Sequence, residues 1–155
     1  MTDTGKSSGK VAHGTHQHPI AHVDTNFDPN KSLATVETVM AFVQSPVVND
    51  LTSVPGIGPV HAANIKSFDY GGRENVCLTT FMLIGKYLML KGESTPVAEH
   101  NELFFQWLGQ IKHITDHRHT IVESIARKVE LMMPGSCWDQ AAYGVAIAKH
   151  LKSVV

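Results

Sequence analysis

The stretch Val54-Pro55-Gly56-Ile57-Gly58-Pro59-Val60 decides the expected fold, because it sets two glycines on either side of one apolar residue. Glycine has no Cβ, so the backbone can turn tightly at both positions and approach a ligand closely. The unbonded amides of the helix that follows, and the positive end of its dipole, favour an anion such as a phosphate. The same turn also suits the plainer role of joining two packed helices.

The segments around this turn all carry helical patterns. A first amphipathic helix is expected from about residue 33 to Pro46, where proline ends it. A short helical turn, the glycine hairpin and a further helix then follow in order. We therefore predict an all-α fold, a compact bundle of about five to six short helices that contains a helix-hairpin-helix motif. The remaining helices are expected at residues 51–54, 60–68, 76–90, 101–112, 115–133 and 136–151.

Several side chains are assigned to the core or to helix ends by their spacing. Thr115 is the predicted N-cap of the helix over 115–133, and Ser136 with Asp139 is the predicted capping box of the last helix. Phe104 and Trp107 are expected in the core rather than as a base-stacking surface. The other residues predicted to face inward are Leu33, Val36, Val39, Met40, Val43, Val60, Ala63, Ile65, Phe68, Leu78, Phe81, Met82, Gly85, Leu88, Met89, Leu103, Leu108, Ile111, Ile121, Ile125, Val129 and Met132.

Composition fits one soluble globular domain with tails. The chain has 155 residues, 43% of them hydrophobic, and a net charge of −1, so no global field attracts nucleic acid. Its only cysteines, Cys77 and Cys137, are expected to be free buried thiols, because neither a secretory leader nor a stretch of about 20 apolar residues is present.

Three regions are predicted: a disordered tail rich in His, Gly and Ser over 1–32, a helical domain over 33–133, and an extra C-terminal helix over 134–155 that packs on the domain. The tail histidines match no zinc pattern, and the expected helix break at Thr115 separates His113 from His117, so no metal site is predicted. No catalytic set or cofactor motif is found either, and the chain is not expected to be an enzyme.

Four motifs, in order, resemble the barrier-to-autointegration factor family of chromatin proteins. They are Phe42-Val43-Gln44-Ser45-Pro46, Leu51-Thr52-Ser53-Val54-Pro55-Gly56-Ile57-Gly58, Gly85-Lys86-Tyr87-Leu88-Met89-Leu90-Lys91 and Glu102-Leu103-Phe104-Phe105-Gln106-Trp107-Leu108. The resemblance covers about residues 36–133, and this chain has longer loops around 70–78 and 93–101.

The resemblance implies a homodimer that binds double-stranded DNA without sequence preference and bridges separate duplexes. It also implies LEM-domain proteins of the inner nuclear membrane as partners, no direct membrane insertion, and a location on chromosomes in the nucleus, with the cytoplasm as a further possibility. The central helix would form the dimer interface through Gly85, Leu88 and Met89, although a core contact within one subunit is the alternative for Gly85. The residues implied in DNA binding are Gly56, Ile57, Gly58, Val60, His61, Lys66, His117 and Arg118.

One departure from the family pattern keeps other interpretations open. Two lysines of the family fall where this chain has Ala63 and Asn64, and Lys66 replaces them only in part. A dimer that binds protein partners and little or no DNA is therefore the second hypothesis. A DNA-anchoring fragment of an enzyme is the third.

Overall fold

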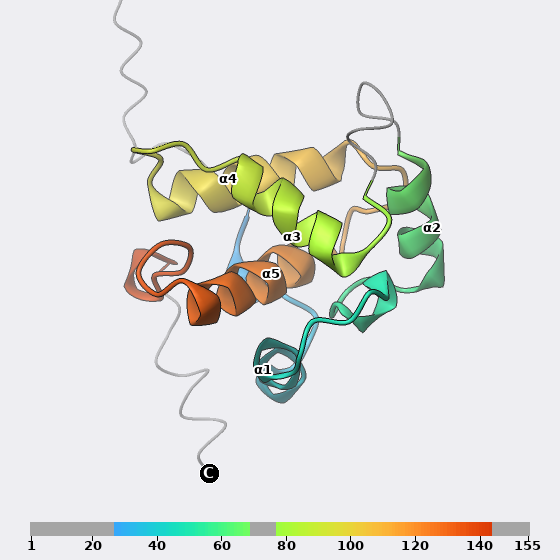
Figure 1. The fold of residues 1–155 in the computed structure, drawn as a ribbon, viewed down its shortest axis with the longest axis horizontal. Coiled ribbons are helices and arrows are strands. Elements are labelled where there is room, and N and C mark those ends of the chain that lie inside the picture. The colour runs from blue at the N-terminus through green and yellow to red at the C-terminus, as the bar shows by residue number, and fades with distance from the viewer. Residues whose placement is uncertain (1–26, 69–76, 144–155) are drawn as a thin grey trace, which may run out of the picture.

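A computed structural model describes residues 27–68 and 77–143. Within these residues the fold is all-helical with no strands, and it forms a compact bundle of five α-helices (Figure 1). The α-helices are α1 (Val36–Gln44), α2 (Pro59–Ser67), α3 (Thr80–Met89), α4 (Val97–Gly109) and α5 (Arg118–Met132). Three short 3-10 turns accompany them: η2 (Pro29–Lys31), η3 (Leu51–Ser53) and η5 (Ala141–Tyr143). The predicted all-α class and the compact helical bundle are confirmed.

Helix α5 lies at the centre of the bundle. It contacts α1, α3, α4 and η2, and Figure 1 shows α1 and α4 on different sides of it. Every residue from Thr120 to Ala126 is buried, including the polar Glu123 and Ser124. The predicted core positions Ile121, Ile125 and Val129 are confirmed.

Local hydrogen bonds move several helix starts from their predicted places. Thr79 begins α3, because its hydroxyl accepts the Met82 N–H, so the helix predicted over 76–90 starts at Thr80. Its predicted first residue, Val76, lies outside the described residues. Thr115 is not the N-cap of α5, which begins three residues later with His117 at the cap. Helix α4 begins earlier than predicted, at Val97, with Pro96 at the cap position.

The apolar band predicted for the core on α3 faces outward instead. Phe81, Met82 and Met89 are 55%, 39% and 73% exposed. Leu83, Ile84 and Tyr87 are buried in their place. This helix is apolar nearly all round, so its spacing alone does not say which side meets the core. Other predicted core residues that are exposed are Leu33, Val60, Ala63, Leu78, Leu103 and Met132.

Ordered structure begins before the predicted boundary at residue 33. The ring of Phe27 is 1% exposed and packs against Phe105, Trp138 and Tyr143. Its N–H donates to Glu102 over 3.0 Å, and the next N–H, of Asp28, donates to His119 Nδ1 over 3.0 Å. Phe27 and Asp28, which fall within the predicted tail, are therefore bound to α4 and α5, while residues 1–26 lie outside the described part.

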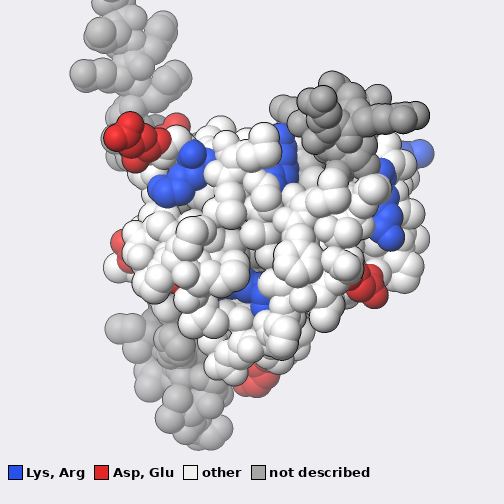
Figure 2. Space-filling model, viewed as in Figure 1, with Lys and Arg blue, Asp and Glu red and all other residues white. Residues whose placement is uncertain are grey.

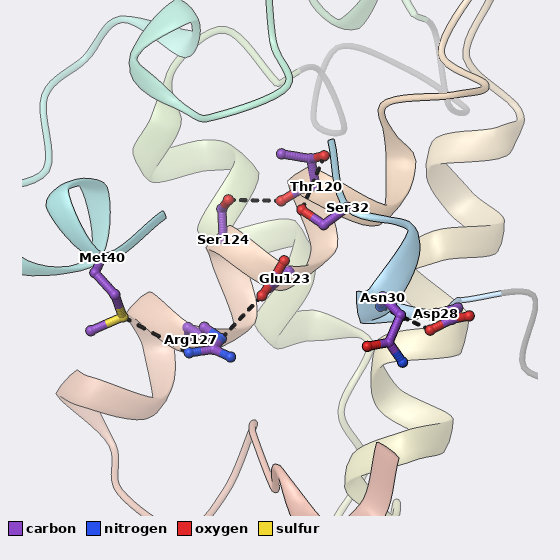
Figure 3. A network of polar contacts seen from close by, with 8 residues as sticks. All are labelled: Asp28, Asn30, Ser32, Met40, Thr120, Glu123, Ser124 and Arg127. Atoms are coloured by element: carbon purple, nitrogen blue, oxygen red, sulfur yellow. Dashed lines mark hydrogen bonds and ion pairs between the residues drawn. The ribbon is translucent and has the colours of Figure 1, made fainter. Parts of the chain in front are cut away.

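Hydrogen bonds attach this N-terminal segment to α5. Ser32 and the Leu33 N–H both donate to the Thr120 hydroxyl, and Thr120 in turn accepts from Ser124 through its carbonyl. Figure 3 shows Ser32 beside Thr120, with Ser124 one turn further along α5. Hence the chain is held beside the start of α5 before α1 begins.

The segment after α5 is a loop held by one carboxylate. Glu130 accepts the backbone N–H groups of Gly135, Ser136, Cys137 and Trp138. The predicted capping box does not form, because the Ser136 hydroxyl donates to the Met133 carbonyl and no α-helix occurs in 136–143. The rest of that predicted helix lies outside the described residues.

In the described part of the C-terminal region, Trp138 and Tyr143 pack against the core. The prediction of free, buried cysteines is confirmed. Cys77 and Cys137 are buried and free.

Candidate nucleic-acid interface

The glycine hairpin is a tight turn that is held by a backbone hydrogen bond and by two buried side chains. The Ile57 N–H donates to the Val54 carbonyl over 3.0 Å, and both of these side chains are buried. Gly56 has φ +91°, a conformation that glycine adopts without strain. The Ile57 amide, one of the predicted phosphate contacts, thus already has a backbone acceptor in this structure.

The backbone beyond the turn is open. Gly58 is the N-cap of α2 and makes no side-chain cap, and a Cβ built there would meet nothing within 4 Å. The N–H groups of Gly58, Val60 and His61 have no acceptor in the described parts of the chain. Pro59 has no N–H, so the first turn of α2 offers three free donors at the positive end of its dipole.

The start of α5 meets this turn. A Cβ at Gly56 would lie 3.1 Å from Ile121 Cγ1 and 3.2 Å from the His117 carbonyl oxygen, so the two backbones pack as closely as glycine permits. The rings of His61 and His117 lie 5.0 Å apart between centroids. Two helix N-termini, of α2 and α5, therefore converge at one place on the surface.

Arg118 is largely committed to structure rather than exposed for a ligand. Its guanidinium lies 4.0 Å from the Phe105 ring centroid and donates to the carbonyls of Phe105 and Thr115, each over 3.3 Å. Of its five N–H donors, three remain for other contacts. We expected Arg118 to be the best charged contact with DNA. In the structure its guanidinium chiefly joins the start of α5 to Phe105 on α4.

The remaining predicted contact, Lys66, lies apart from the turn. It is exposed in the last turn of α2, and Gly58 caps the first. Ala63 is exposed. The amide of Asn64 donates to the Lys112 carbonyl over 3.0 Å and ties α2 to the segment before α5.

An open groove of about 820 Å³ runs beside the hairpin. Residues of α1, η3, the hairpin, and the starts of α2 and α5 line it. Its lining residues are Leu33, Ala34, Thr38, Ala41, Phe42, Ser45, Thr52, Ser53, Val54, Pro55, Gly56, Ile57, Gly58, Pro59, Val60, His61, His117 and Thr120.

Two of the three proposed dimer residues, Gly85 and Met89, lie on the open side of α3. A Cβ at Gly85 would meet nothing within 4 Å, which argues against the alternative that Gly85 makes a core contact within one subunit. Met89 is exposed, and Leu88 is half-buried against the core. Phe81 and Met82 on the same helix are also exposed.

Charge is sparse on the face of the molecule that Figure 2 shows. Figure 2 shows Lys and Arg side chains scattered over a mostly uncharged face, without one large basic patch. Comparison with family models, with curated proteins and with solved structures finds no match for this chain. No helix in the described residues is long and apolar enough to cross a membrane.

Sequence reasoning missed two features of this site. The ring contact between His61 and His117 joins residues far apart in the chain, so no local sequence pattern predicts it. The commitment of Asn64 to the Lys112 carbonyl is likewise a tertiary contact. The glycine spacing, in contrast, was a sufficient signal for the turn itself.

Proposed function

We propose that this chain binds double-stranded DNA without sequence preference, as a homodimer that bridges separate duplexes. The observation that carries the proposal is the exposed first turn of α2, where Gly58, Val60 and His61 present unbonded N–H groups beside the start of α5. Backbone donors at a helix N-terminus suit a phosphate oxygen. Such contacts position a duplex without reading its bases.

The form of the surface supports a mode of binding that depends little on lysine and arginine. With a net charge of −1 and no lysine at Ala63 or Asn64, few counterions would be released on binding. We therefore expect a shallow dependence of affinity on salt. Chromosomes in the nucleus are the location that this activity would require.

Helix α3 supports the homodimer. Phe81, Met82 and Met89 are exposed on one side of α3, and Gly85 adds open space where another helix can approach closely. Exposed apolar surface of this kind is costly on a monomer in water. A second copy packed against this surface would place two hairpins on one particle, which is what bridging needs.

The first experiment is binding of the purified protein to a short blunt duplex of arbitrary sequence at low and moderate salt. Gly58→Glu should abolish binding, because the added carboxylate lies at the first turn of α2 and repels phosphate. Gly58→Ala is the matched control, since a Cβ there meets nothing within 4 Å. Equal binding by Gly58→Glu and the wild type would contradict the hairpin as the phosphate contact.

A second candidate function is a dimer that binds protein partners, such as LEM domains, with little DNA affinity. The engagement of Asn64 with the Lys112 carbonyl favours it, because the position is not available for a phosphate contact. Absence of duplex binding at low salt by a well-folded dimer would favour this candidate over the first.

A further inference from the structure

The groove beside the hairpin contains two titratable side chains in its lining, His61 and His117. They come from the first turn of α2 and the N-cap of α5, the two helix N-termini that converge at this surface. The other polar side chains of the lining are hydroxyls. No carboxylate lines the groove to balance a positive charge on either imidazole, so an anion from outside would have to do so.

The hydrogen bond of His61 decides what its ring can offer. Nδ1 lies 3.1 Å from the Gly56 carbonyl oxygen, which can only accept, so Nδ1 carries a proton. In the neutral ring Nε2 is then a lone-pair acceptor, which does not bind a phosphate oxygen. Protonation turns Nε2 into a charged donor. His61 therefore becomes a phosphate ligand only after it takes up a proton.

His117 adds to the same effect. Its ring lies 5.0 Å from that of His61, so two protonated imidazoles would repel each other and would both oppose the positive helix ends. A phosphate between them would relieve both repulsions. Protonation of both rings is therefore more favourable with a phosphate bound than without it.

We propose that duplex DNA binding at this groove is coupled to proton uptake by His61 and His117, so that affinity rises as the pH falls from 7.5 to 5.5. This inference rests on the proposed function and names its regulation. Histidine is the side chain whose change of charge ordinarily serves as a switch in the physiological pH range. Linkage makes the effect reciprocal, and bound DNA must raise the protonation of the same two rings.

The other polar side chains that line the groove are hydroxyls, which do not ionise in this pH range. From α1 and η3 the groove receives the hydroxyls of Thr38, Ser45, Thr52 and Ser53, and from α5 that of Thr120. The charged neighbours of His117 in the chain are Asp116, which is exposed, and Arg118, whose guanidinium is held by Phe105 and Thr115. On α2 the nearest charge along the chain is Lys66, which does not line the groove.

The test measures the affinity for one short blunt duplex at pH 7.5 and pH 5.5 at constant ionic strength. We expect about tenfold tighter binding by the wild type at the lower pH. The double variant His61→Gln with His117→Gln should show one affinity at both pH values, since Gln can still donate to the Gly56 carbonyl but cannot take up a proton. His113→Gln, at an exposed histidine that does not line the groove, is the matched control and should keep the wild-type pH dependence. Circular dichroism at both pH values checks that each variant is folded.

A second readout follows the imidazole protons of both rings by NMR with and without the duplex. Their titration midpoints should move to higher pH when the duplex is bound. Binding that does not change with pH, or a pH dependence that survives in the double variant, would overturn the inference and leave the proposed function standing. A failure to bind duplex at either pH would overturn both.

Discussion

The ammonium group of Lys128 on α5 lies 2.6 Å from the carbonyl oxygen of Phe42 in the last turn of α1. It donates a second bond of 2.6 Å to the Ser45 carbonyl and lies over the Phe42 ring. Lys128 is 2% exposed, and burial lowers the pKa of its ammonium group. Negative carbonyls at the C-terminus of α1 therefore take the place of a carboxylate partner, and they fix α1, one wall of the groove, to the central helix.

Replacing this ammonium should be costly. We expect Lys128→Met to lower the free energy of unfolding by about 2 to 4 kcal/mol, because buried carbonyl oxygens lose their donor. Urea unfolding at neutral pH measures the loss. Lys112→Met, at an exposed lysine, is the control and should change stability little. A loss below about 0.5 kcal/mol for Lys128→Met would contradict this role.

The two hairpin glycines should respond differently to alanine. Gly56→Ala is expected to destabilise the fold by about 1 to 3 kcal/mol, because φ is +91° and a Cβ would press on Ile121, Thr120 and the His117 carbonyl. Gly58→Ala should be nearly neutral, since its φ is −88° and the space is open. Thermal melts of both variants compare them. Equal melting temperatures would show that Gly56 is not required by the turn.

A charge on the outer face of α3 should break the homodimer. Met89 is 73% exposed, so Met89→Glu should fold normally and place a carboxylate in the proposed interface. Light scattering with size-exclusion chromatography should give a dimer for the wild type and a monomer for this variant. Leu131→Glu on α5, at a position 60% exposed, is the matched control and should remain dimeric. If both variants remain dimeric, the dimer interface does not involve this face of α3.

Acid should release the loop after α5 through Glu130. Burial alone would raise the pKa of this carboxyl, but the four backbone N–H donors of residues 135–138 outweigh it and hold the pKa below 4.5. The folded state therefore binds fewer protons than the unfolded state, and stability is lost as the pH falls below about 4.5 through the folded pKa. Glu130→Gln should lose stability at pH 7 and show a weaker fall in acid. Urea unfolding followed by Trp138 fluorescence, at pH 7 and at a pH below 4.5, tests this prediction. Glu99→Gln, at an exposed carboxylate, is the control.

Stability should also fall in a higher pH window because of His100. This side chain is 0% exposed, its Nε2 donates to the Tyr87 carbonyl over 2.6 Å, and burial lowers its pKa from 6.5. The unfolded chain takes up the proton first, so stability is complete above pH 6.5 and falls as the pH drops below it. The pKa of His119 is lowered in the same way by burial and adds to the slope. His100→Gln should flatten the dependence of the unfolding free energy on pH between pH 7 and pH 5. An unchanged slope would show that other groups cause this dependence.

Sequence predicted what depends on local pattern. The glycine turn, the helical class and the burial of Phe104, Trp107 and Ile125 all follow from spacing and from residues with one strong preference. The N-caps at Thr35 and Thr79 are local features of the same kind that were not predicted, although threonine is a common cap residue. These features need no knowledge of distant residues.

What the sequence could not predict depends on tertiary contact. The orientation of α3 is decided by Tyr87, whose hydroxyl donates to Asn101 on α4 over 2.6 Å and whose ring stacks on His100. No spacing along α3 contains that information, because apolar residues surround the helix. Arg118 was assigned to DNA through the family resemblance, and its contact with the Phe105 ring is a tertiary contact that the sequence did not reveal.

The position of Phe27 has a practical consequence for work on this protein. A shortened chain that begins at Leu33 would omit this ring and leave an empty aromatic socket between Phe105, Trp138 and Tyr143. An unfilled space of that size costs about 3 to 5 kcal/mol when a phenylalanine is lost from a core. Recombinant versions of the helical domain should therefore keep the chain from residue 27 onward, and an affinity tag belongs ahead of that point.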